Sequence, residues 1–295
     1  MKNKKNILNT KRIRSLGIIF LITIFLTLFY VFFYPQKKLK LIFCDVGQGD
    51  SILINYFWFQ ILIDTGEDRK VLSCLKANMS PFDKKINFVF LSHPDSDHVG
   101  GLNYLLSEYE VENLFVNDYT YFHKNFIQIR NKFQSIFKKM RIINTNSVKN
   151  VFFHNLIKVK IISSDGNFQS SFKKKSLNCN NHSTVLLFNL ANFLFLSAGD
   201  IEAEVEEILV SNDLLRKVDI LKVSHHGSNS SSTEKFIDKI QPRISVIQVG
   251  ANNTYKHPNE EIIERLKEYS LDVYRNDKNG EVGFVFKNNK IFILD

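Results

Sequence analysis

Short apolar segments that end in aspartate or histidine recur along this chain of 295 residues. The segments have the length and the apolar character of buried β-strands, and stretches with helix-like spacing of apolar residues lie between them. Alternating strands and helices predict one compact α/β domain, with sheets packed between helices. Loops at strand ends often form functional sites, because a rigid sheet holds them in place. The segments end at Asp64, His93, Asp200 and the pair His225 and His226.

The sequence HPDSDH at 93–98 is the strongest local signal. It places four potential metal ligands within six residues, since imidazole nitrogens and carboxylate oxygens both coordinate divalent cations. In an irregular loop, His93 and Asp95 can face one point while Asp97 and His98 face a second. The alternative interpretation is a polar loop in which an aspartate caps the helix that follows.

Two further positions strengthen the metal hypothesis. Asp200 follows an apolar segment and a glycine, where a carboxylate can bridge two cations, and His225 and His226 follow another apolar segment. The alternatives are an N-cap for a helix over 201–211 and a solvent-exposed histidine loop. All three groups in one chain favour a site for one or two divalent metal ions.

These motifs, in this order, resemble the metallo-β-lactamase fold superfamily: HPDSDH at 93–98, GD at 199–200 and SHHGS at 224–228. DVGQGDS at 45–51, LIDTG at 62–66 and YKHP at 255–258 resemble one branch of it, the C-terminal hydrolase domain of ComEC-type competence (DNA-uptake) proteins and its stand-alone relatives. DVGQGDS is also similar to bacterial surface phosphorylcholine esterases. The resemblance covers residues 40–295 and implies a four-layer αββα sandwich with metals at one edge of its two sheets.

The resemblance also implies roles for individual residues. The positions that match metal ligands are His93, Asp95, Asp97, His98, Asp200 and His226. Asp97 is in addition expected to orient the nucleophile, and His225 to face the substrate as a proton donor or an oxyanion contact. Asp64 is expected to support the site from a neighbouring strand, and His257 to contact substrate.

Two departures from the superfamily pattern bear on the metal. Asp95 stands where a second histidine is more usual, and the added carboxylate favours Mn²⁺ over Zn²⁺. The superfamily often has another histidine ligand before the strand that leads to Gly199 and Asp200, where this chain reads CNNHST at 179–184. Either Cys179, Asn181 or His182 completes the first metal site, or its ligand is missing.

Residues 16–34 form an uncharged stretch of 19 residues, close to the length that crosses a bilayer as a helix. Six Lys and Arg precede it and three follow it, so the positive-inside rule places the N-terminus in the cytoplasm. We therefore predict a basic tail and one transmembrane helix in residues 1–36, and an extracytoplasmic domain over 37–295. The alternatives are a cleaved signal peptide, which lacks a small-residue cleavage site here, and a buried core helix.

The net charge of +9 belongs to the N-terminal segment. Residues 1–40 hold nine of the 39 Lys and Arg and no acid, which leaves 30 basic residues against 30 acidic ones. The charge therefore does not predict a basic nucleic-acid-binding domain. The cysteines, Cys44, Cys74 and Cys179, are odd in number and widely spaced, and we interpret them as isolated small apolar side chains without a disulfide.

The predicted function is that of a membrane-anchored hydrolase that uses a metal-activated water, with Zn²⁺ or Mn²⁺ as the cofactor. A phosphodiesterase, acting as a nuclease on extracellular DNA, is the first hypothesis. The alternatives are an envelope esterase, such as a phosphorylcholine esterase, and a non-catalytic membrane-tethered binding module in DNA uptake. With one hydrophobic segment, a role in uptake requires a channel partner. A true β-lactamase is disfavoured because its motif variant differs.

Overall fold

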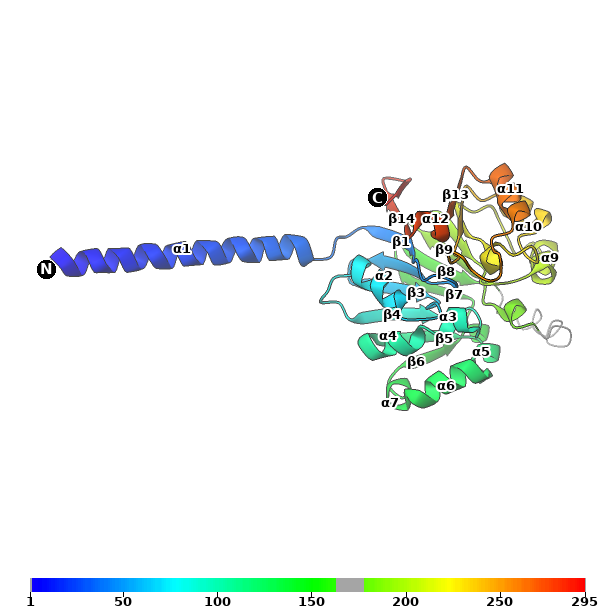
Figure 1. The fold of residues 1–295 in the computed structure, drawn as a ribbon, viewed down its shortest axis with the longest axis horizontal. Helices are drawn as coiled ribbons and strands as arrows, with labels where there is room; N and C mark the ends of the chain where they lie inside the picture. The colour runs from blue at the N-terminus through cyan, green and yellow to red at the C-terminus, as the bar shows by residue number, and fades with distance from the viewer. Residues whose placement is uncertain (1, 163–177, 295) are drawn as a thin grey trace.

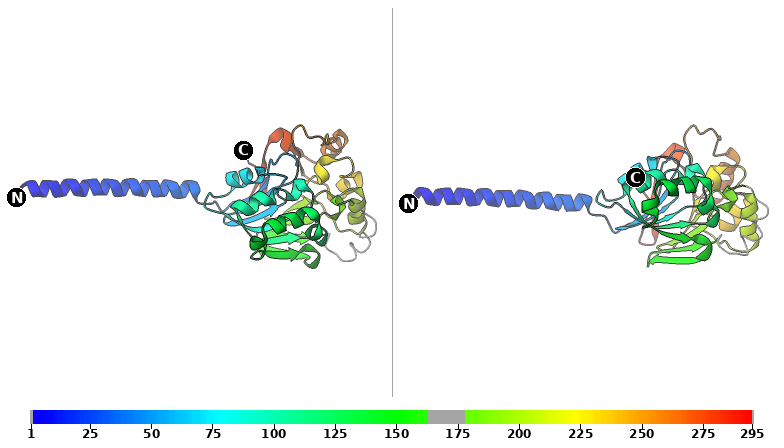
Figure 2. Two further views of the ribbon diagram at one scale, coloured as in Figure 1. Left: turned by 60° about the horizontal axis from the view of Figure 1, so that its bottom comes forward. Right: turned by 90° about the horizontal axis from the view of Figure 1, so that it is seen from below.

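The computed structural model describes residues 2–162 and 178–294. Its first element is a long helix, α1 (Lys2–Phe33), which projects from the rest of the chain (Figure 1). Among the helices of these described residues, none combines the length and the apolar character that a membrane crossing requires. The remainder is built on two β-sheets with helices on their outer faces (Figure 2).

The first sheet has eight strands in the order β15-β14-β1-β2-β3-β4-β5-β6. Its antiparallel part runs from β15 to β3, and β3, β4, β5 and β6 are parallel. The bounds are β1 (Leu39–Phe43), β2 (Ile52–Tyr56), β3 (Phe59–Ile63), β4 (Lys85–Phe90), β5 (Glu110–Val116), β6 (Arg141–Asn144), β14 (Val282–Lys287) and β15 (Lys290–Ile293).

The second sheet repeats this plan with seven strands in the order β13-β12-β11-β10-β9-β8-β7. Here β7 to β10 are antiparallel, and β10, β11, β12 and β13 are parallel. The bounds are β7 (Asn150–His154), β8 (Ile157–Ile161), β9 (Leu186–Leu190), β10 (Phe193–Ser197), β11 (Ile220–Lys222), β12 (Ile244–Ile247) and β13 (Asp272–Arg275).

Three apolar clusters hold the layers together. One packs helices α2, α4, α6 and α7 on the first sheet, one fills the space between the sheets, and one packs α9, α10 and α11 on the second sheet. The helices are α2 (Lys70–Asn78), α3 (Ser96–Val99), α4 (Leu102–Glu108), α5 (Asp118–Phe122), α6 (Lys124–Lys132), α7 (Gln134–Phe137), α9 (Ala203–Ser211), α10 (Glu234–Ile240), α11 (Glu260–Tyr269) and α12 (Asn276–Asn279), with short 3₁₀ turns η1 (Thr145–Ser147), η2 (Asn180–His182) and η3 (Ser224–Gly227). The predicted αββα sandwich is confirmed.

The expectation that the cysteines are unpaired is wrong for two of them. Cys44, just after β1, and Cys74, in α2, form a disulfide with their Cα atoms 5.6 Å apart. The two residues are 30 positions apart, and only the packing of α2 over β1 brings them together. Cys179 is a free thiol. The bond fastens the outer helical layer to the strand that begins the domain.

We predict that thiol titration of the denatured, unreduced protein finds one free thiol. Removing the bond with a Cys44→Ala/Cys74→Ala pair should lower the free energy of unfolding by about 3–4 kcal/mol, from the entropy of the loop of roughly 30 residues that the bond closes. Thermal denaturation with and without dithiothreitol measures this. The double variant serves as the control, because its melting temperature should not respond to reductant. Three titratable thiols in the wild type would contradict the prediction.

Candidate metal centre

The ends of parallel strands from both sheets meet at one edge of the sandwich. In the first sheet β3 is parallel to β4, and in the second β10, β11 and β12 are parallel, so their carboxyl ends share that edge. The loop between β1 and β2 lies there too, since β2 is antiparallel to both β1 and β3. A Cβ on Gly250, after β12, would lie 2.7 Å from the backbone nitrogen of Gln48, so the loops of the two sheets are in direct contact.

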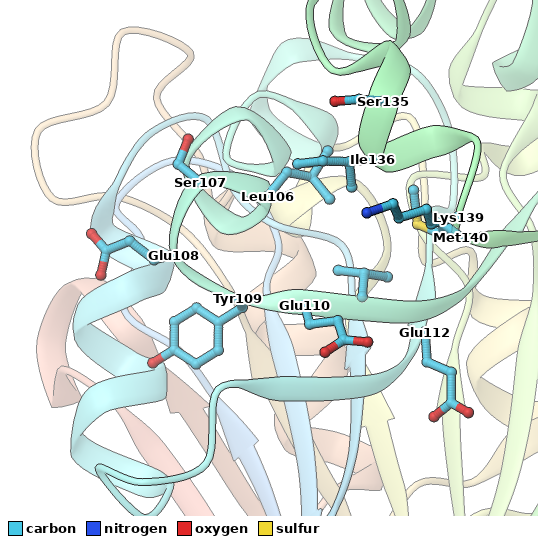
Figure 3. Close-up of a pocket in the computed structure, with 11 residues that line it drawn as sticks. Leu106, Ser107, Glu108, Tyr109, Glu110, Glu112, Ser135, Ile136, Lys139 and Met140 are labelled. Carbon is cyan, nitrogen blue, oxygen red and sulfur yellow. The ribbon is translucent and has the colours of Figure 1, made fainter.

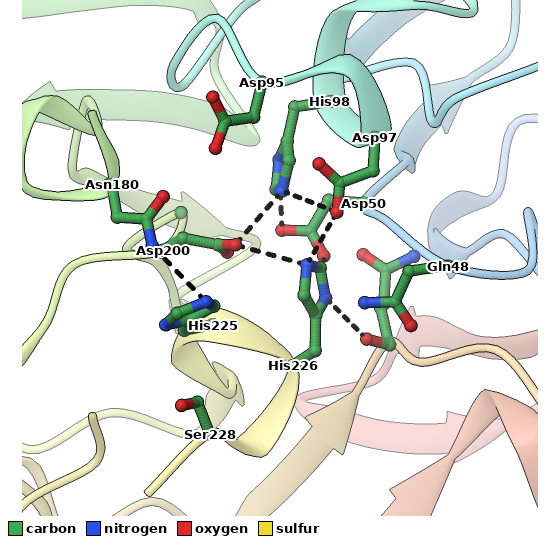
Figure 4. Close-up of polar contacts among 12 residues, drawn as sticks. Gln48, Asp50, Asp95, Asp97, His98, Asn180, Asp200, His225, His226 and Ser228 are labelled. Atoms are coloured by element: carbon green, nitrogen blue, oxygen red, sulfur yellow. Dashed lines mark hydrogen bonds and ion pairs between the residues drawn. The ribbon is translucent and has the colours of Figure 1, made fainter. Parts of the chain in front are cut away.

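Four buried side chains from these loops converge on one point (Figure 4). Asp50, His98, Asp200 and His226 each offer a ligand atom within 4.8 Å of the others. Asp200 Oδ2 lies 3.2 Å from Nε2 of both His98 and His226. Asp97 Oδ2 lies 3.3 Å from Nε2 of His226. Carboxylate and imidazole groups in this arrangement form a donor set suited to a divalent cation.

The Nδ1 atoms of His98 and His226, which face away from the cluster, already have polar partners. Nδ1 of His98 lies 3.0 Å from Asp64 Oδ2, and Nδ1 of His226 lies 2.8 Å from the carbonyl oxygen of Gln248. Such partners hold a metal-ligating histidine with its other nitrogen facing the metal. Nε2 of His93, His98 and His226 is buried in each case and makes no hydrogen bond of good geometry among the described residues, although each lies 3.2–3.6 Å from an aspartate oxygen. Buried nitrogens that face carboxylates without well-formed hydrogen bonds fit a metal site.

The loop at 93–98 does not use its first aspartate as a helix cap. Asp95 occupies the N-cap position of α3, but its side chain makes no capping hydrogen bond. Its Oδ2 lies 3.6 Å from Nε2 of His93, and its Oδ1 lies 2.7 Å from Cys179 Sγ. His93 and Asp95 therefore face a second point beside the cluster, as the alternation of ligands in the loop predicts.

Residues 179–184 contain the three candidates for the missing ligand, and one of them lies at this second point. Cys179 contacts Asp95. Burial, and to a smaller extent the neighbouring Asp95 carboxylate, raises the pKa of the Cys179 thiol to about 12. Asn181 Oδ1 accepts a hydrogen bond from the backbone nitrogen of Glu202. The ring of His182 stacks on Tyr119 with centroids 4.0 Å apart. Among the candidates left open, Cys179 has a contact to a predicted ligand, Asp95.

The backbone turns the two adjacent histidines in different directions. His225 and His226 both have positive φ, 49° and 53°, a strained conformation for residues with a side chain. His226 faces the cluster, whereas His225 Nε2 lies 3.3 Å from Asn180 Nδ2 and its Nδ1 lies 3.1 Å from Ser230 Oγ. Burial lowers the pKa of His225, which keeps its ring neutral near pH 7.

A small cleft of about 100 Å³ opens onto the cluster. It is lined by Gln48, Asp95, Asp97, Asn180, Asp200, His225, His226, Tyr255 and His257. The predicted substrate residues His225 and His257 are neighbours in it, with ring centroids 5.7 Å apart. Asp64 lies behind the cluster, where it accepts hydrogen bonds from the backbone nitrogen and hydroxyl of Ser92, at 2.8 and 2.6 Å.

A larger hollow lies elsewhere and has different chemistry. It measures about 610 Å³ and is lined by residues of α4, β5 and α7 around the start of β5 (Figure 3). The start of β5 lies at the edge opposite the cluster, because β5 is parallel to β4. None of its lining residues is His, Asp or Cys. Its glutamates form no metal-ligand group among the described residues, whereas the cluster beside the smaller cleft does.

Two members of the centre escaped the sequence analysis, Asp50 and Lys222. The Lys222 ammonium is fully buried, pairs with the Asp50 carboxylate, and donates to Gly199 O at 3.0 Å and Asp200 Oδ1 at 3.1 Å. Burial opposes its charge, yet Asp50 and Asp200 raise the pKa of Lys222 above its usual value. The available signal was a lysine inside the apolar segment ILKV at 220–223.

The charges of the centre are strongly coupled. Burial opposes ionisation of Asp200, but His226, Lys222 and His98 hold the pKa of its carboxyl well below the usual range. Burial likewise disfavours a charged His226, yet Asp200 and its neighbours raise the pKa of that ring to about 10. These carboxylates thus attract positive charge, which protons on His98 and His226 or a bound cation can supply.

The chain is similar in sequence to one known superfamily and to competence proteins. A family model described as "Metallo-beta-lactamase superfamily" matches residues 44–250. "ComE operon protein 3" of Bacillus subtilis (strain 168) is 28% identical over 286 residues, covering 88% of this chain and 35% of that protein. "Competence protein ComA" of Neisseria gonorrhoeae is 23% identical, covering 85% of this chain and 33% of that protein. The resemblance to ComEC-type competence proteins is confirmed, although the chain spans about a third of the length of these relatives.

A solved structure shares the fold at low identity. The crystal structure of CmlA, a diiron β-hydroxylase from Streptomyces venezuelae, aligns with a TM-score of 0.54 and 10% identity, covering 88% of this chain and 55% of that chain. At that identity the likeness shows the fold alone.

We predict that Lys222 and Asp50 are coupled as a buried ion pair. Lys222→Met or Asp50→Asn alone should lower the free energy of unfolding by about 3–5 kcal/mol, because each deprives a buried charge of its nearest partner. The double variant should lose less than the sum of the two, since it removes both charges, although Asp200 still lacks its contact with Lys222. Chemical denaturation of the four proteins, freed of metal with a chelator, measures the coupling. Additive losses in the double variant would contradict it.

Proposed function

Because this chain belongs to the metallo-β-lactamase superfamily, we propose that it is a metal-dependent hydrolase acting on phosphodiesters. The observation that carries the proposal is the set of three buried Nε2 atoms of His93, His98 and His226, which face aspartate carboxylates at 3.2–3.6 Å without well-formed hydrogen bonds. A cation between these nitrogens and carboxylates would satisfy both, and buried polar atoms without good partners cost stability.

The donor atoms would divide into two groups. Asp97, His98, Asp200 and His226 would hold one ion, and His93, Asp95 and Cys179 would hold a second, with Asp200 available to both. A divalent cation bound there would supply Lewis acidity and lower the pKa of a water molecule toward 7. The carboxylates suit Mn²⁺, whereas imidazoles with a thiolate suit Zn²⁺. Asp50 is already neutralised by Lys222, so we assign it a supporting role.

The remaining residues of the cleft would handle the substrate. Asp97, on the rim of the cluster and part of the cleft lining, would accept a hydrogen bond from the nucleophile and orient it. His225 is 22% exposed and would donate a hydrogen bond to a phosphoryl oxygen or to the leaving group. Glu202 Oε1, 3.4 Å from Nδ1 of His225, would stabilise the ring when it takes up a proton. His257 and Tyr255 would line the path of the substrate.

We propose DNA, or another polymer joined by phosphodiesters, as the substrate. The support is the similarity to the proteins named "ComE operon protein 3" and "Competence protein ComA". A part in DNA uptake would require a channel supplied by a partner. The alternative function, an esterase that acts on envelope phosphodiesters, would use the same reaction at phosphorus. A panel of DNA and envelope phosphodiester substrates separates the two functions.

We also propose that residues 16–34 attach the protein to the cytoplasmic membrane, with residues 37–295 on the outer side. The support is the charge distribution on either side of that uncharged segment and the exposure of its large apolar side chains, for example Leu16 at 66% and Phe25 at 65%. The disulfide between Cys44 and Cys74 supports the outer location, since such bonds persist in oxidising compartments.

We predict different outcomes for the two adjacent histidines. In the full chain in detergent, His226→Ala should lose metal and activity together, because it removes a ligand. His225→Ala should keep its metal but lose about 10²–10⁴-fold in rate toward bis(p-nitrophenyl) phosphate, the usual size of a proton-transfer contribution. Elemental analysis and the rate assay give both quantities.

Glu110→Gln, in the hollow at the opposite edge, is the matched control and should change neither metal content nor rate. A wild-type protein that binds metal yet hydrolyses no phosphodiester, neither the nitrophenyl ester nor DNA, would reject the hydrolase in favour of a binding module. Unchanged metal and rate in both histidine variants would show that the cluster is not the site.

We predict that Cys179 is a ligand of the second ion. Protein loaded with Co²⁺ should show thiolate-to-cobalt charge-transfer absorption, because a thiolate bonded to cobalt gives such bands and a free thiol does not. Cys179→Ser should abolish the band, whereas Cys44→Ala/Cys74→Ala should keep it, since those sulfurs are paired. A band that survives Cys179→Ser would remove the thiol from the site without affecting the other ligands.

A further inference from the structure

A cluster of aromatic side chains lies where α1 meets the domain. Three separate segments supply it: the end of α1, with Tyr34 just after it, the turn between β2 and β3, with Phe57 and Trp58, and the loop before β4, with Phe82. Tyr34 lies 5.5 Å from Phe57 and 6.2 Å from Trp58 between ring centroids. Phe82 lies 5.4 Å from Phe29 of α1. We call Tyr34, Phe57, Trp58 and Phe82 the aromatic seat.

The seat is exposed to an extent that is unusual for rings of this size. The exposed fractions are 42% for Tyr34, 40% for Trp58 and 61% for Phe82. The Lys37 ammonium lies 5.4 Å from the centroid of the Phe57 ring, and Lys38 and Lys84 are exposed nearby in sequence. Aromatic rings with lysines beside them are the composition that proteins place at the boundary between bilayer and water.

We propose that the aromatic seat rests in the interfacial region of the bilayer and fixes how the domain sits on the membrane. The inference rests on the proposed attachment through residues 16–34. That segment ends at Tyr34, so if it lies in the bilayer, Tyr34 lies at the boundary. Rings whose centroids lie within 6.2 Å of Tyr34 then lie at nearly the same depth. The exposed rings would thereby leave water, which stabilises the docked orientation.

This orientation decides where the candidate metal centre faces. The turn at Phe57 and Trp58 joins the end of β2 to the start of β3, whereas the cluster lies at the end of β3, after Ile63. The five residues of β3 separate these edges by roughly 17 Å. The cleft therefore opens on the side of the domain away from the lipid. We infer a polymeric substrate that approaches from the aqueous phase, not a phosphodiester in the headgroups of the same bilayer.

The chain contains a single tryptophan, Trp58, which reports directly on the seat. The full chain is reconstituted into phosphatidylcholine and phosphatidylglycerol vesicles, and attachment is scored by flotation. In floated protein, Trp58 fluorescence should be quenched by lipids brominated near the headgroup. It should also be protected several-fold from aqueous acrylamide relative to the protein in detergent.

A Trp58→Phe/Phe122→Trp variant moves the probe to the opposite edge. Phe122, at the end of α5 after β5, is 70% exposed and lies on the side of the cleft. In floated vesicles its tryptophan should be open to acrylamide and insensitive to brominated lipid. Equal quenching by lipid at both positions would overturn the orientation.

Two other outcomes are separable. Protein that floats while Trp58 stays open to acrylamide and unquenched by lipid overturns the seat and leaves the attachment standing. Protein that does not float overturns the attachment, and the seat with it. Neither outcome affects the hydrolase proposal, which the phosphodiester assay tests alone.

Discussion

The carboxylate of Asp200 is the point at which the two halves of the domain are joined electrostatically. One oxygen accepts from the buried ammonium of Lys222, and the other lies 3.2 Å from Nε2 of both His98 and His226. His98 comes from the first sheet, while Lys222 and His226 come from the second. A carboxylate without hydrogen bonds could not remain ionised at this depth, so its partners have to be held in place by both sheets.

The fold holds these partners in place because the two sheets have the same topology. Each sheet has parallel strands whose carboxyl ends reach the same edge, and the apolar cluster between the sheets sets their separation. The loops at this edge can therefore have irregular backbones and still hold their side chains in fixed positions. The positive φ angles at Asp64, His225 and His226 lie at strand ends, where the flanking strands and packed helices hold the strained backbone. The metal centre thus depends on sheet packing more than on the conformation of any one loop.

The opposite edge carries the connection to α1 and the exposed aromatic rings. The two ends of the same short strands thus differ in character, with charged groups that need cations at one end and rings that favour an apolar boundary at the other. The disulfide between Cys44 and Cys74 ties β1 to the helix that covers it, close to the loop that holds Asp50. The segment that links α1 to the domain is consequently anchored in the same strand that leads into the centre.

The sequence by itself determined the alternation of strands and helices and the residues of the loop at 93–98, because apolar periodicity and ligand spacing are local. Its resemblance to the metallo-β-lactamase superfamily implied the αββα class. The sequence missed the Lys222 and Asp50 pair and the Cys44 and Cys74 disulfide, and it left three candidates beside the first metal position. In each case the partners are distant in the chain: Asp50 and Lys222 belong to different sheets, and Cys179 meets Asp95 only after the sheets pack. Tertiary structure decided these, because contacts between distant segments depend on how layers stack, and no local pattern records that.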